Sequence, residues 1–311
     1  MATRTELDIK RQKRRLEQLR KQQRTISIFV TILSSIIIIL SFVSVKKNFD
    51  KPEAAPPAEA PISDSTNTKT ESLPETEPDI LKTLPKGDGV KTAYLTFDDG
   101  PTTSVTPHIL DILRRYDIKA TFFLAGSLAE KNPAIALRAH SEGHLLANHS
   151  YSHDYSDLYA SGTAFMSEID KAHAIICGIT GDENYPKIFR FPGGSYDAGT
   201  HGKAKQEYKV LLKDAGFRFC DWNSLSGDAE SKSPTVDGLI KRVKSSSKGK
   251  EDLVILMHDS ATKKVNIKAL PQIIDYLISE GYTFDTLDNV PNEIPTAETS
   301  EKTEDTKNAD D

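Results

Sequence analysis

Residues 93–101 read AYLTFDDGP, a short apolar run that ends in two adjacent acids and a Gly-Pro turn. Such a run is typical of a buried parallel strand, because strands covered on both faces lack a regular alternation of polar and apolar residues. Further runs of this kind, rich in aromatic or branched residues, follow along the chain. We expect strands at residues 93–97, 120–124, 144–147, 188–191, 217–221, 253–257 and 283–287.

Helical stretches lie between most of these runs and have recognisable ends. Asn132 followed by Pro133 places a capping residue before a first-turn proline, and Gly143 is a typical stop signal. Strands that alternate with helices over about 200 residues predict an α/β fold, an incomplete or distorted parallel (β/α) barrel of about seven strands. An open doubly wound sheet is the alternative, but no glycine spacing of a dinucleotide or phosphate loop follows the first run.

The charge of the 311-residue chain is unevenly distributed, although its net value is only -5. Residues 1–45 carry nine Lys and Arg against three acids, whereas residues 90–288 carry 23 against 26. The central block therefore lacks the basic stripe that nucleic-acid-binding domains carry. We expect no nucleic-acid partner. We attribute the excess of basic residues at the N-terminus to the cytoplasmic side of a membrane anchor.

Residues 25–45 form a run of 21 residues without a charge. A helix of this length spans the apolar core of a bilayer, which is about 30 Å thick. Basic residues between Lys10 and Arg24 precede the run, and positive charge is retained on the cytoplasmic side. A cleaved signal peptide is the alternative, but its apolar core is about 7–15 residues long and Val43-Ser44-Val45 is a poor cleavage site. We expect a single-pass cell-membrane anchor with a cytoplasmic N-terminus.

The segments on either side of the central block differ from it sharply in composition. Residues 46–89 are rich in Pro, Glu, Ala and Thr and cannot bury enough apolar surface to order themselves, and residues 290–311 have the same character. We therefore divide the chain into a basic cytoplasmic segment (1–24), a transmembrane helix (25–45), an extracytoplasmic linker (46–89), a catalytic domain (90–289) and an acidic tail (290–311).

Two cysteines, Cys177 and Cys220, lie in the predicted catalytic domain. An extracytoplasmic position permits a disulfide between them. Their spacing in the sequence does not decide whether they pair, and two buried free thiols fit equally well.

Polar side chains follow four of the expected strands. In a parallel barrel, functional groups gather beyond the carboxyl ends of the strands, so these side chains are predicted to share one rim. Each motif alone has an ordinary explanation, such as a turn for Asp-Asp-Gly-Pro, but their joint occurrence predicts one site. The residues are Asp98 and Asp99 after the first strand, His149 and His153 after the third, Arg190 at the end of the fourth and His258 after the sixth.

These residue types form a consistent chemical set. One carboxylate and two neutral imidazoles make a three-ligand site that suits Zn²⁺ or a similar divalent ion, with positions left for water and substrate. A second carboxylate beside the first can accept a proton from water, and a separate histidine can protonate a leaving amine. The set predicts metal-assisted amide hydrolysis.

Four segments resemble the successive motifs of the polysaccharide deacetylase family, the NodB-homology or carbohydrate esterase family 4 domain. They are residues 96–101 (TFDDGP), 149–153 (HSYSH), 190–194 (RFPGG) and 256–258 (LMH). The resemblance covers about 200 of the 311 residues and keeps the order of the motifs. By position it implies that Asp98 is the catalytic base, that Asp99, His149 and His153 bind the metal, that Arg190 orients the base, and that His258 is the catalytic acid.

The resemblance also implies an acetyl pocket lined by Leu256 and an oxyanion contact from the backbone N–H of Gly193. Family members often carry a bulky aromatic residue where Gly193 stands, so we expect a more open wall there. Tyr151, between the two histidines, fits either a wall of the substrate groove or a packing role.

The fourth family motif is altered in this chain. Leu225 stands where the family has an aspartate and Ala229 where it has a tryptophan. That aspartate is expected to support the arginine beside the base. We therefore predict that another carboxylate reaches Arg190, with Asp228 preferred and Asp221 as the alternative.

The resemblance implies a hydrolase that removes N-acetyl groups from a cell-envelope glycan, with the N-acetylglucosamine of peptidoglycan preferred because a short tether keeps the domain near the wall. The cofactor is expected to be Zn²⁺, with Co²⁺ or another divalent ion as alternatives. Poly-N-acetylglucosamine, chitin oligomers and muramic acid residues are alternative substrates. A glycan-binding domain without turnover is the rival from another class, and the sequence does not indicate an oligomeric state.

Overall fold

The apolar run that contains residues 93–101 forms the central strand of a parallel sheet. The structure is a computed structural model that describes residues 79–85, 89–196 and 201–291. Strand β1 (Thr92–Gly100) pairs in parallel with β2, β7 and β8, and the sheet has the order β5-β4-β3-β2-β1-β7-β6. The other strands are β2 (Thr121–Leu124), β3 (Leu145–Asn148), β4 (Ile188–Phe189), β5 (Arg218–Phe219), β6 (Ser224–Leu225), β7 (Asp252–His258) and β8 (Thr283–Phe284).

The predicted incomplete parallel barrel is confirmed. Within the described ranges, no pairing joins the outermost strands β5 and β6, so the barrel does not close. All seven expected strands occur, but β4, β5 and β8 have only two residues each. Strand β6 was not predicted, because its two residues, Ser224 and Leu225, are too few to produce a pattern and form a strand only by pairing with β7.

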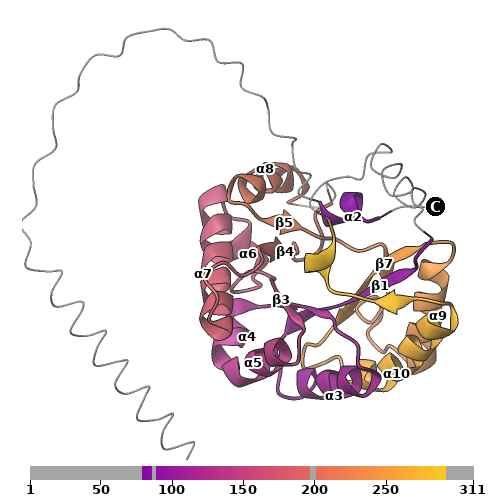
Figure 1. Ribbon diagram of the computed structural model, residues 1–311. Helices are drawn as coiled ribbons and strands as arrows, with labels where there is room; N and C mark the ends of the chain where they lie inside the picture. The colour runs from indigo at the N-terminus through magenta and orange to yellow at the C-terminus, as the bar shows by residue number, and fades with distance from the viewer. Residues whose placement is uncertain (1–78, 86–88, 197–200, 292–311) are drawn as a thin grey trace, which may run out of the picture. The chain divides into compact units, whose positions relative to one another are not determined.

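Helices form a ring outside the strands (Figure 1). Buried apolar side chains on these helices, such as Ile109, Leu110 and Leu113 of α3, belong to the hydrophobic core. The helices are α2 (Ile80–Thr83), α3 (Thr106–Tyr116), α4 (Gly126–Lys131), α5 (Pro133–Ser141), α6 (Tyr155–Leu158), α7 (Gly162–Thr180), α8 (Gly202–Asp214), α9 (Val236–Ser247) and α10 (Val265–Ser279), with a 3-10 turn at Leu287–Asn289.

Side chains of the central strands fill the main hydrophobic core together with buried side chains of α3. Leu95 and Phe97 of β1 are fully buried, and the Phe97 ring stacks on Phe122 of β2 with 5.2 Å between ring centroids. Burying a large apolar side chain contributes about 1.5–3 kcal/mol, so this packing fixes the strands rigidly. The barrel is a solid support, and chemistry is confined to its rim.

The folded domain begins earlier and ends later than the predicted boundaries. Ile80, placed in the linker by composition, is fully buried in the core, and Val290 is 2% exposed. Arg218 holds both ends, since it donates hydrogen bonds to the hydroxyl of Thr83 and to the carbonyl oxygens of Val290 and Pro291. A few apolar residues at the end of a polar segment are sufficient to dock it onto a preformed sheet.

The cysteines do not pair. Cys220 is a buried free thiol after β5, and Cys177 is a partly exposed free thiol on α7. Burial raises the pKa of the Cys220 thiol to about 12, so it stays protonated.

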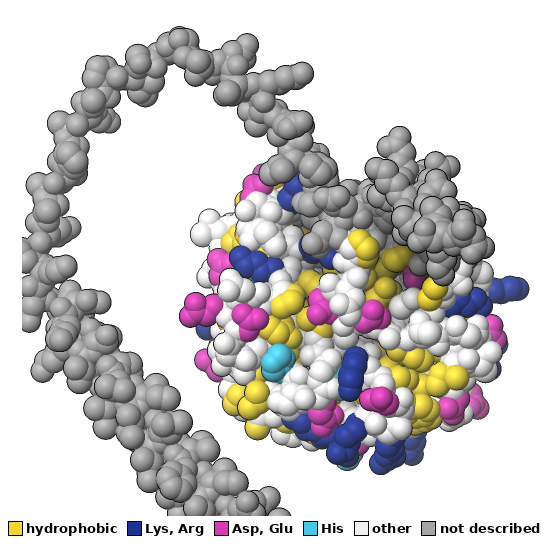
Figure 2. Space-filling view, viewed as in Figure 1, with side chains coloured by type: hydrophobic (Ala, Val, Ile, Leu, Met, Phe, Trp, Pro, Cys, Tyr) yellow, Lys and Arg dark blue, Asp and Glu magenta, His cyan; other side chains and the backbone are white. Residues whose placement is uncertain are grey.

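The predicted membrane span at residues 25–45 lies outside the described residues. Among the helices of the described ranges, none is both long and apolar enough to cross a bilayer. On the face of the domain drawn in Figure 2, Lys and Arg side chains are interspersed with Asp and Glu around the edge.

The substitution Ile80→Ala tests whether residues 79–84 belong to the fold. It removes a fully buried side chain, and we expect it to lower the free energy of unfolding by about 2–5 kcal/mol in urea denaturation. Val90→Ala changes a side chain that is 51% exposed and should stay within about 0.5 kcal/mol of the parent. Equal midpoints for Ile80→Ala and the parent would show that this segment is not part of the cooperative unit.

Candidate active site

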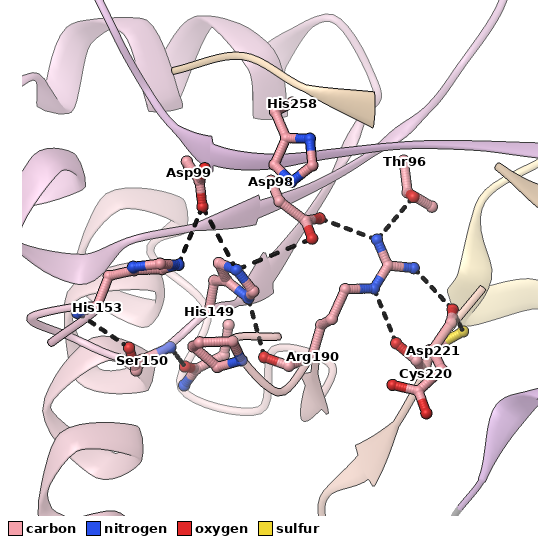
Figure 3. A network of polar contacts seen from close by, with 12 residues as sticks. Thr96, Asp98, Asp99, His149, Ser150, His153, Arg190, Cys220, Asp221 and His258 are labelled. Carbon is pink, nitrogen blue, oxygen red and sulfur yellow. Dashed lines mark hydrogen bonds and ion pairs between the residues drawn. The ribbon is translucent and has the colours of Figure 1, made fainter. Parts of the chain in front are cut away.

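The carboxyl ends of β1, β3, β4 and β7 bring the predicted residues to one rim. In the pairing of β1 with β7, Asp98 lies opposite His258. His149 follows β3 and Arg190 follows β4, and the backbone N–H of Arg190 donates to the carbonyl of Asn148. Parallel register therefore places residues from distant parts of the chain around one point, as Figure 3 shows.

Asp99, His149 and His153 form a candidate metal site. The Oδ1 atom of Asp99 lies 3.5 Å from Nε2 of His149 and 3.1 Å from Nε2 of His153, and the three ligand atoms lie within 4.8 Å of one another. Nδ1 of His149 is 2.9 Å from the carbonyl oxygen of Arg190, which can only accept a hydrogen. The Nε2 lone pair of His149 therefore faces Asp99, as a metal ligand requires.

The contacts within Asp99, His149 and His153 favour an ionised Asp99. Burial alone would raise the pKa of Asp99, but its hydrogen bonds to His149 and His153 outweigh burial and hold that pKa well below its usual range. The hydrogen bond to Asp99 raises the pKa of His153, against the opposing effect of burial. A carboxylate that stays ionised next to two imidazoles fits a divalent cation.

Backbone strain accompanies the triad. Asp99, Ser150 and His153 have positive φ angles of 73°, 67° and 56°, a region that residues other than glycine rarely adopt. Each such conformation costs about 1–3 kcal/mol and persists only where the surroundings impose it. The Ser150 hydroxyl accepts from the N–H of His153, and Glu168 accepts from the N–H of Ser152, so the loop is fixed by its own hydrogen bonds.

Arg190 is fully buried beside Asp98, as predicted. Its NH1 group donates to Oδ1 of Asp98 at 2.9 Å and to the hydroxyl of Thr96 at 2.7 Å. Its Nε and NH2 groups donate to the backbone carbonyls of Cys220 and Asp221 at 2.8 and 3.0 Å. The prediction that Asp228 supports Arg190 is wrong, because these carbonyls after β5 already satisfy the guanidinium and no second carboxylate is needed.

Asp221, the alternative supporter, contacts Arg190 only through its backbone. Its carboxylate instead accepts from the N–H and the hydroxyl of Ser195, at 2.9 and 2.6 Å. Asp221 therefore holds Ser195, which directly follows Gly193 and Gly194.

Asp228 belongs to His258. Its Oδ1 atom lies 2.8 Å from Nδ1 of His258, and its Oδ2 atom accepts from the backbone N–H of His258 and from the side chain of Asn266. Burial lowers the pKa of His258, but the hydrogen bond and charge of Asp228, together with Asp98 and Asp99, more than offset it and raise the pKa to about 9. His258 is thus a cation at neutral pH that can donate a proton.

A further buried acid, Asp259, directly follows β7 and lies next to β1. It was not predicted as part of the site. It is fully buried, its backbone N–H donates to the carbonyl of Asp98, and its carboxylate accepts from the hydroxyl of Thr106 at 2.5 Å. A Cβ on Gly100 would lie 2.1 Å from this carboxylate, so only glycine fits there. Burial raises the pKa of Asp259 to about 7. An acid that follows a strand in sequence gives no sign of such burial.

A cavity of about 440 Å³ opens over these groups. The predicted metal ligands, Asp98 and His258 all line it, as do Leu256, Gly193, Leu225 and Ala229. Tyr155 and Trp222 also line it. Neither was predicted as a site residue, because an aromatic residue near a motif is more often part of the core.

Tyr151 is not among the residues that line this cavity. Its hydroxyl donates to Glu130 at 2.9 Å, and the Lys171 ammonium lies 3.4 Å from the centre of its ring. Of the two predicted roles, packing therefore fits and the groove wall does not. The open wall expected at Gly193 is also absent, because Tyr155 occupies that space.

The comparisons with known proteins agree with this geometry. The family described as polysaccharide deacetylase matches residues 86–210. A peptidoglycan-N-acetylglucosamine deacetylase of Bacillus cereus is 34% identical over 213 residues, which are 67% of this chain and 74% of the relative. The catalytic domain of a peptidoglycan N-acetylglucosamine deacetylase from Eubacterium rectale superposes with a TM-score of 0.60 at 34% identity, covering 67% of this chain and 94% of that structure.

The fold and the rim define an incomplete parallel barrel with a carboxylate–histidine cluster at its rim that could hold a metal ion. The chain belongs to the polysaccharide deacetylase family. One structural neighbour at 24% identity, with a TM-score of 0.55 and coverage of 67% of this chain and 68% of its own, is a pseudoenzyme of carbohydrate esterase family 4 from Bacillus anthracis. The fold alone therefore does not establish turnover, and catalytic activity must be inferred from the side chains at the rim.

The pairing of Asp228 with His258 can be measured directly. Asp228→Asn removes the negative charge while keeping the shape, so the His258 pKa should fall from about 9 towards its ordinary value of about 6.5 in an NMR titration with chelator present. Asp221→Asn, which changes an acid bound to Ser195, should leave the His258 pKa in place. An unchanged His258 pKa in Asp228→Asn would contradict the pairing.

Proposed function

We propose that this chain is a metal-dependent N-deacetylase that removes acetyl groups from N-acetylglucosamine residues of peptidoglycan. The observation that carries the proposal is the set of groups around one cavity. Asp98 and His258 both face the cavity that contains the Asp99–His149–His153 site, and each has its own buried partner, Arg190 or Asp228.

The donor set fits a divalent cation. Asp99, His149 and His153 offer one oxygen and two nitrogens within 4.8 Å of one another, the composition that Zn²⁺ prefers in catalytic sites with open positions. We propose Zn²⁺, with Co²⁺ as a functional substitute. The chemistry that such an ion supplies is polarisation of an amide carbonyl and of a water molecule.

The protein groups divide the proton transfers between them. Asp98, held by Arg190, accepts a proton from the attacking water. His258 is charged because Asp228, with Asp98 and Asp99, outweighs the opposing effect of burial and raises its pKa to about 9; it donates a proton to the amide nitrogen as the C–N bond breaks. The two steps together release acetate and a free amine.

Two further contacts concern the acetyl group. Among the described residues, the Gly193 N–H donates to no protein acceptor, so it is available to the oxygen that develops negative charge. Leu256 and Ala229 line the same cavity and offer an apolar surface for the acetyl methyl group.

Peptidoglycan is the preferred substrate for two reasons. Relatives in Bacillus cereus and Eubacterium rectale carry the name peptidoglycan N-acetylglucosamine deacetylase. The predicted anchor at residues 25–45 and the tether after it would hold the domain outside the membrane, within reach of the wall. The alternatives are other N-acetylated glycans and a binding domain without turnover.

Incubation with purified peptidoglycan and with chitin oligomers tests the proposal. We expect acetate release from peptidoglycan, and mass spectrometry of the digested wall should locate the free amine on glucosamine. Release from muramic acid or from chitin oligomers alone would assign another substrate. If metal-loaded protein releases acetate from none of these glycans, the proposed deacetylase activity is refuted and a glycan-binding domain without turnover is favoured.

Asp98→Asn separates the base from the metal ligands. It removes the proton acceptor and leaves the three ligands, so the metal content should persist while turnover falls by about 10²–10⁴-fold. His149→Ala should lose both the metal and turnover. Asp117→Asn, whose carboxylate is 95% exposed, should behave as the parent. Parent-like turnover of Asp98→Asn would show that the two adjacent aspartates have other roles.

Metal affinity should depend on pH. The pKa of His153 is raised, and the metal must displace its proton, so affinity should fall as the pH drops through that raised pKa. Isothermal titration with Zn²⁺ between pH 8 and pH 5, the interval about the ordinary histidine pKa, measures this dependence. Chelator should abolish acetate release, and Zn²⁺ or Co²⁺ should restore it. Full activity in metal-free protein would refute the mechanism.

A further inference from the structure

The space beside Gly193 is occupied by a residue from another loop. Gly193 has a φ angle of 75°, and a Cβ built on it would lie 2.8 Å from the phenol oxygen of Tyr155 and 3.4 Å from its ring. Real Cβ atoms essentially never make contacts under 3.0 Å, so a side chain at residue 193 would require the Tyr155 side chain to shift from its present position. Tyr155 thus supplies the wall that a larger residue at position 193 would form.

The position of Tyr155 is set by its surroundings. It is the first residue of α6 (Tyr155–Leu158), whose cap Asp154 accepts from the N–H groups of Ser156 and Asp157. Its ring meets His153 edge-on at 5.9 Å between centroids and lies 5.7 Å from the ring of Tyr159. The ring is therefore placed before any ligand arrives, and it lines the catalytic cavity.

The hydroxyl of Tyr155 differs from those of the neighbouring tyrosines. Tyr151 donates to Glu130, and Tyr159 donates to the carbonyl of Pro192, both at 2.9 Å. Within the described part of the chain, the Tyr155 hydroxyl has no hydrogen-bond partner, and the residue is 42% exposed. A phenol is a donor as well as an acceptor, and here its oxygen lies 2.8 Å from the position of a Cβ on Gly193, with both residues lining the cavity.

We propose that Tyr155 is a substrate-contacting residue, whose hydroxyl donates a hydrogen bond to the acetamido group of the bound N-acetylhexosamine beside the Gly193 N–H and whose ring forms one wall of the pocket. This inference rests on the proposed function for the class of substrate. It assigns substrate recognition to a loop outside the family motifs quoted above. The wall is built by α6 instead of residue 193, which leaves the Gly193 backbone accessible.

The test is binding of tetra-N-acetylchitotetraose to Zn²⁺-loaded protein that carries Asp98→Asn, so that the probe is not consumed. Adding Tyr155→Phe removes only the hydroxyl, and we expect the dissociation constant to rise about 3- to 10-fold, as for the loss of one hydrogen bond. Tyr155→Ala also removes the ring contact and should weaken binding further. Tyr151→Phe, which changes a tyrosine outside the cavity, should remain within about twofold of the parent.

Unchanged affinity when Tyr155→Phe and Tyr155→Ala are added to the Asp98→Asn protein, or no binding of the tetramer by the Asp98→Asn protein itself, overturns the inference. Tyr155→Phe decides alone if Tyr155→Ala does not fold. Acetate release by the protein with Asp98 intact is measured separately. A parent that binds the tetramer but releases acetate from no glycan refutes the proposed function and leaves the Tyr155 comparison valid. A parent that deacetylates, with equal kcat/KM in Tyr155→Phe, overturns only the role of Tyr155.

Discussion

The buried guanidinium of Arg190 is the constraint on which the rest of the site depends. Removing a charge from water costs on the order of several kcal/mol unless its donors are satisfied. Here the donors reach a carboxylate and a hydroxyl on β1 and two carbonyls that follow β5, while the Arg190 backbone continues from β4. The charge therefore ties three strands together and aims Asp98 at the cavity, so fold stability and site geometry depend on the same contacts.

The site contains a second, similar pair on its opposite side. Asp228 pairs with His258 much as Arg190 pairs with Asp98, and each partner has a further hydrogen bond, Asp228 from Asn266 and Arg190 to Thr96. In each pair the partner is more deeply buried than the group that faces the cavity. Buried partners are shielded from solvent and keep one orientation. Separate partners therefore hold a proton acceptor and a proton donor in place within a single cavity.

The sequence predicted the rim well and the partners poorly. Asp98, Asp99, His149, His153 and His258 could be selected because parallel strands end at a common edge, and that rule needs only the positions of apolar runs. The same rule does not predict which side chain Asp228 contacts. Arg190 and His258 both needed a partner, and Asp228 was assigned to Arg190 without regard to the two backbone carbonyls, which no pattern of side chains reveals.

By itself, the sequence determined the strand–helix alternation, the incomplete barrel and the set of chemical groups at its rim, because apolar runs, caps and turn residues act locally. Tertiary structure decided which buried charges pair, that Ile80 and Val290 belong to the core, and that Tyr155 and not Tyr151 faces the cavity. The physical reason is distance along the chain. Arg190 and Asp98 are 92 residues apart and Asp228 and His258 are 30 apart, and only the packed barrel specifies which atoms of such segments come into contact.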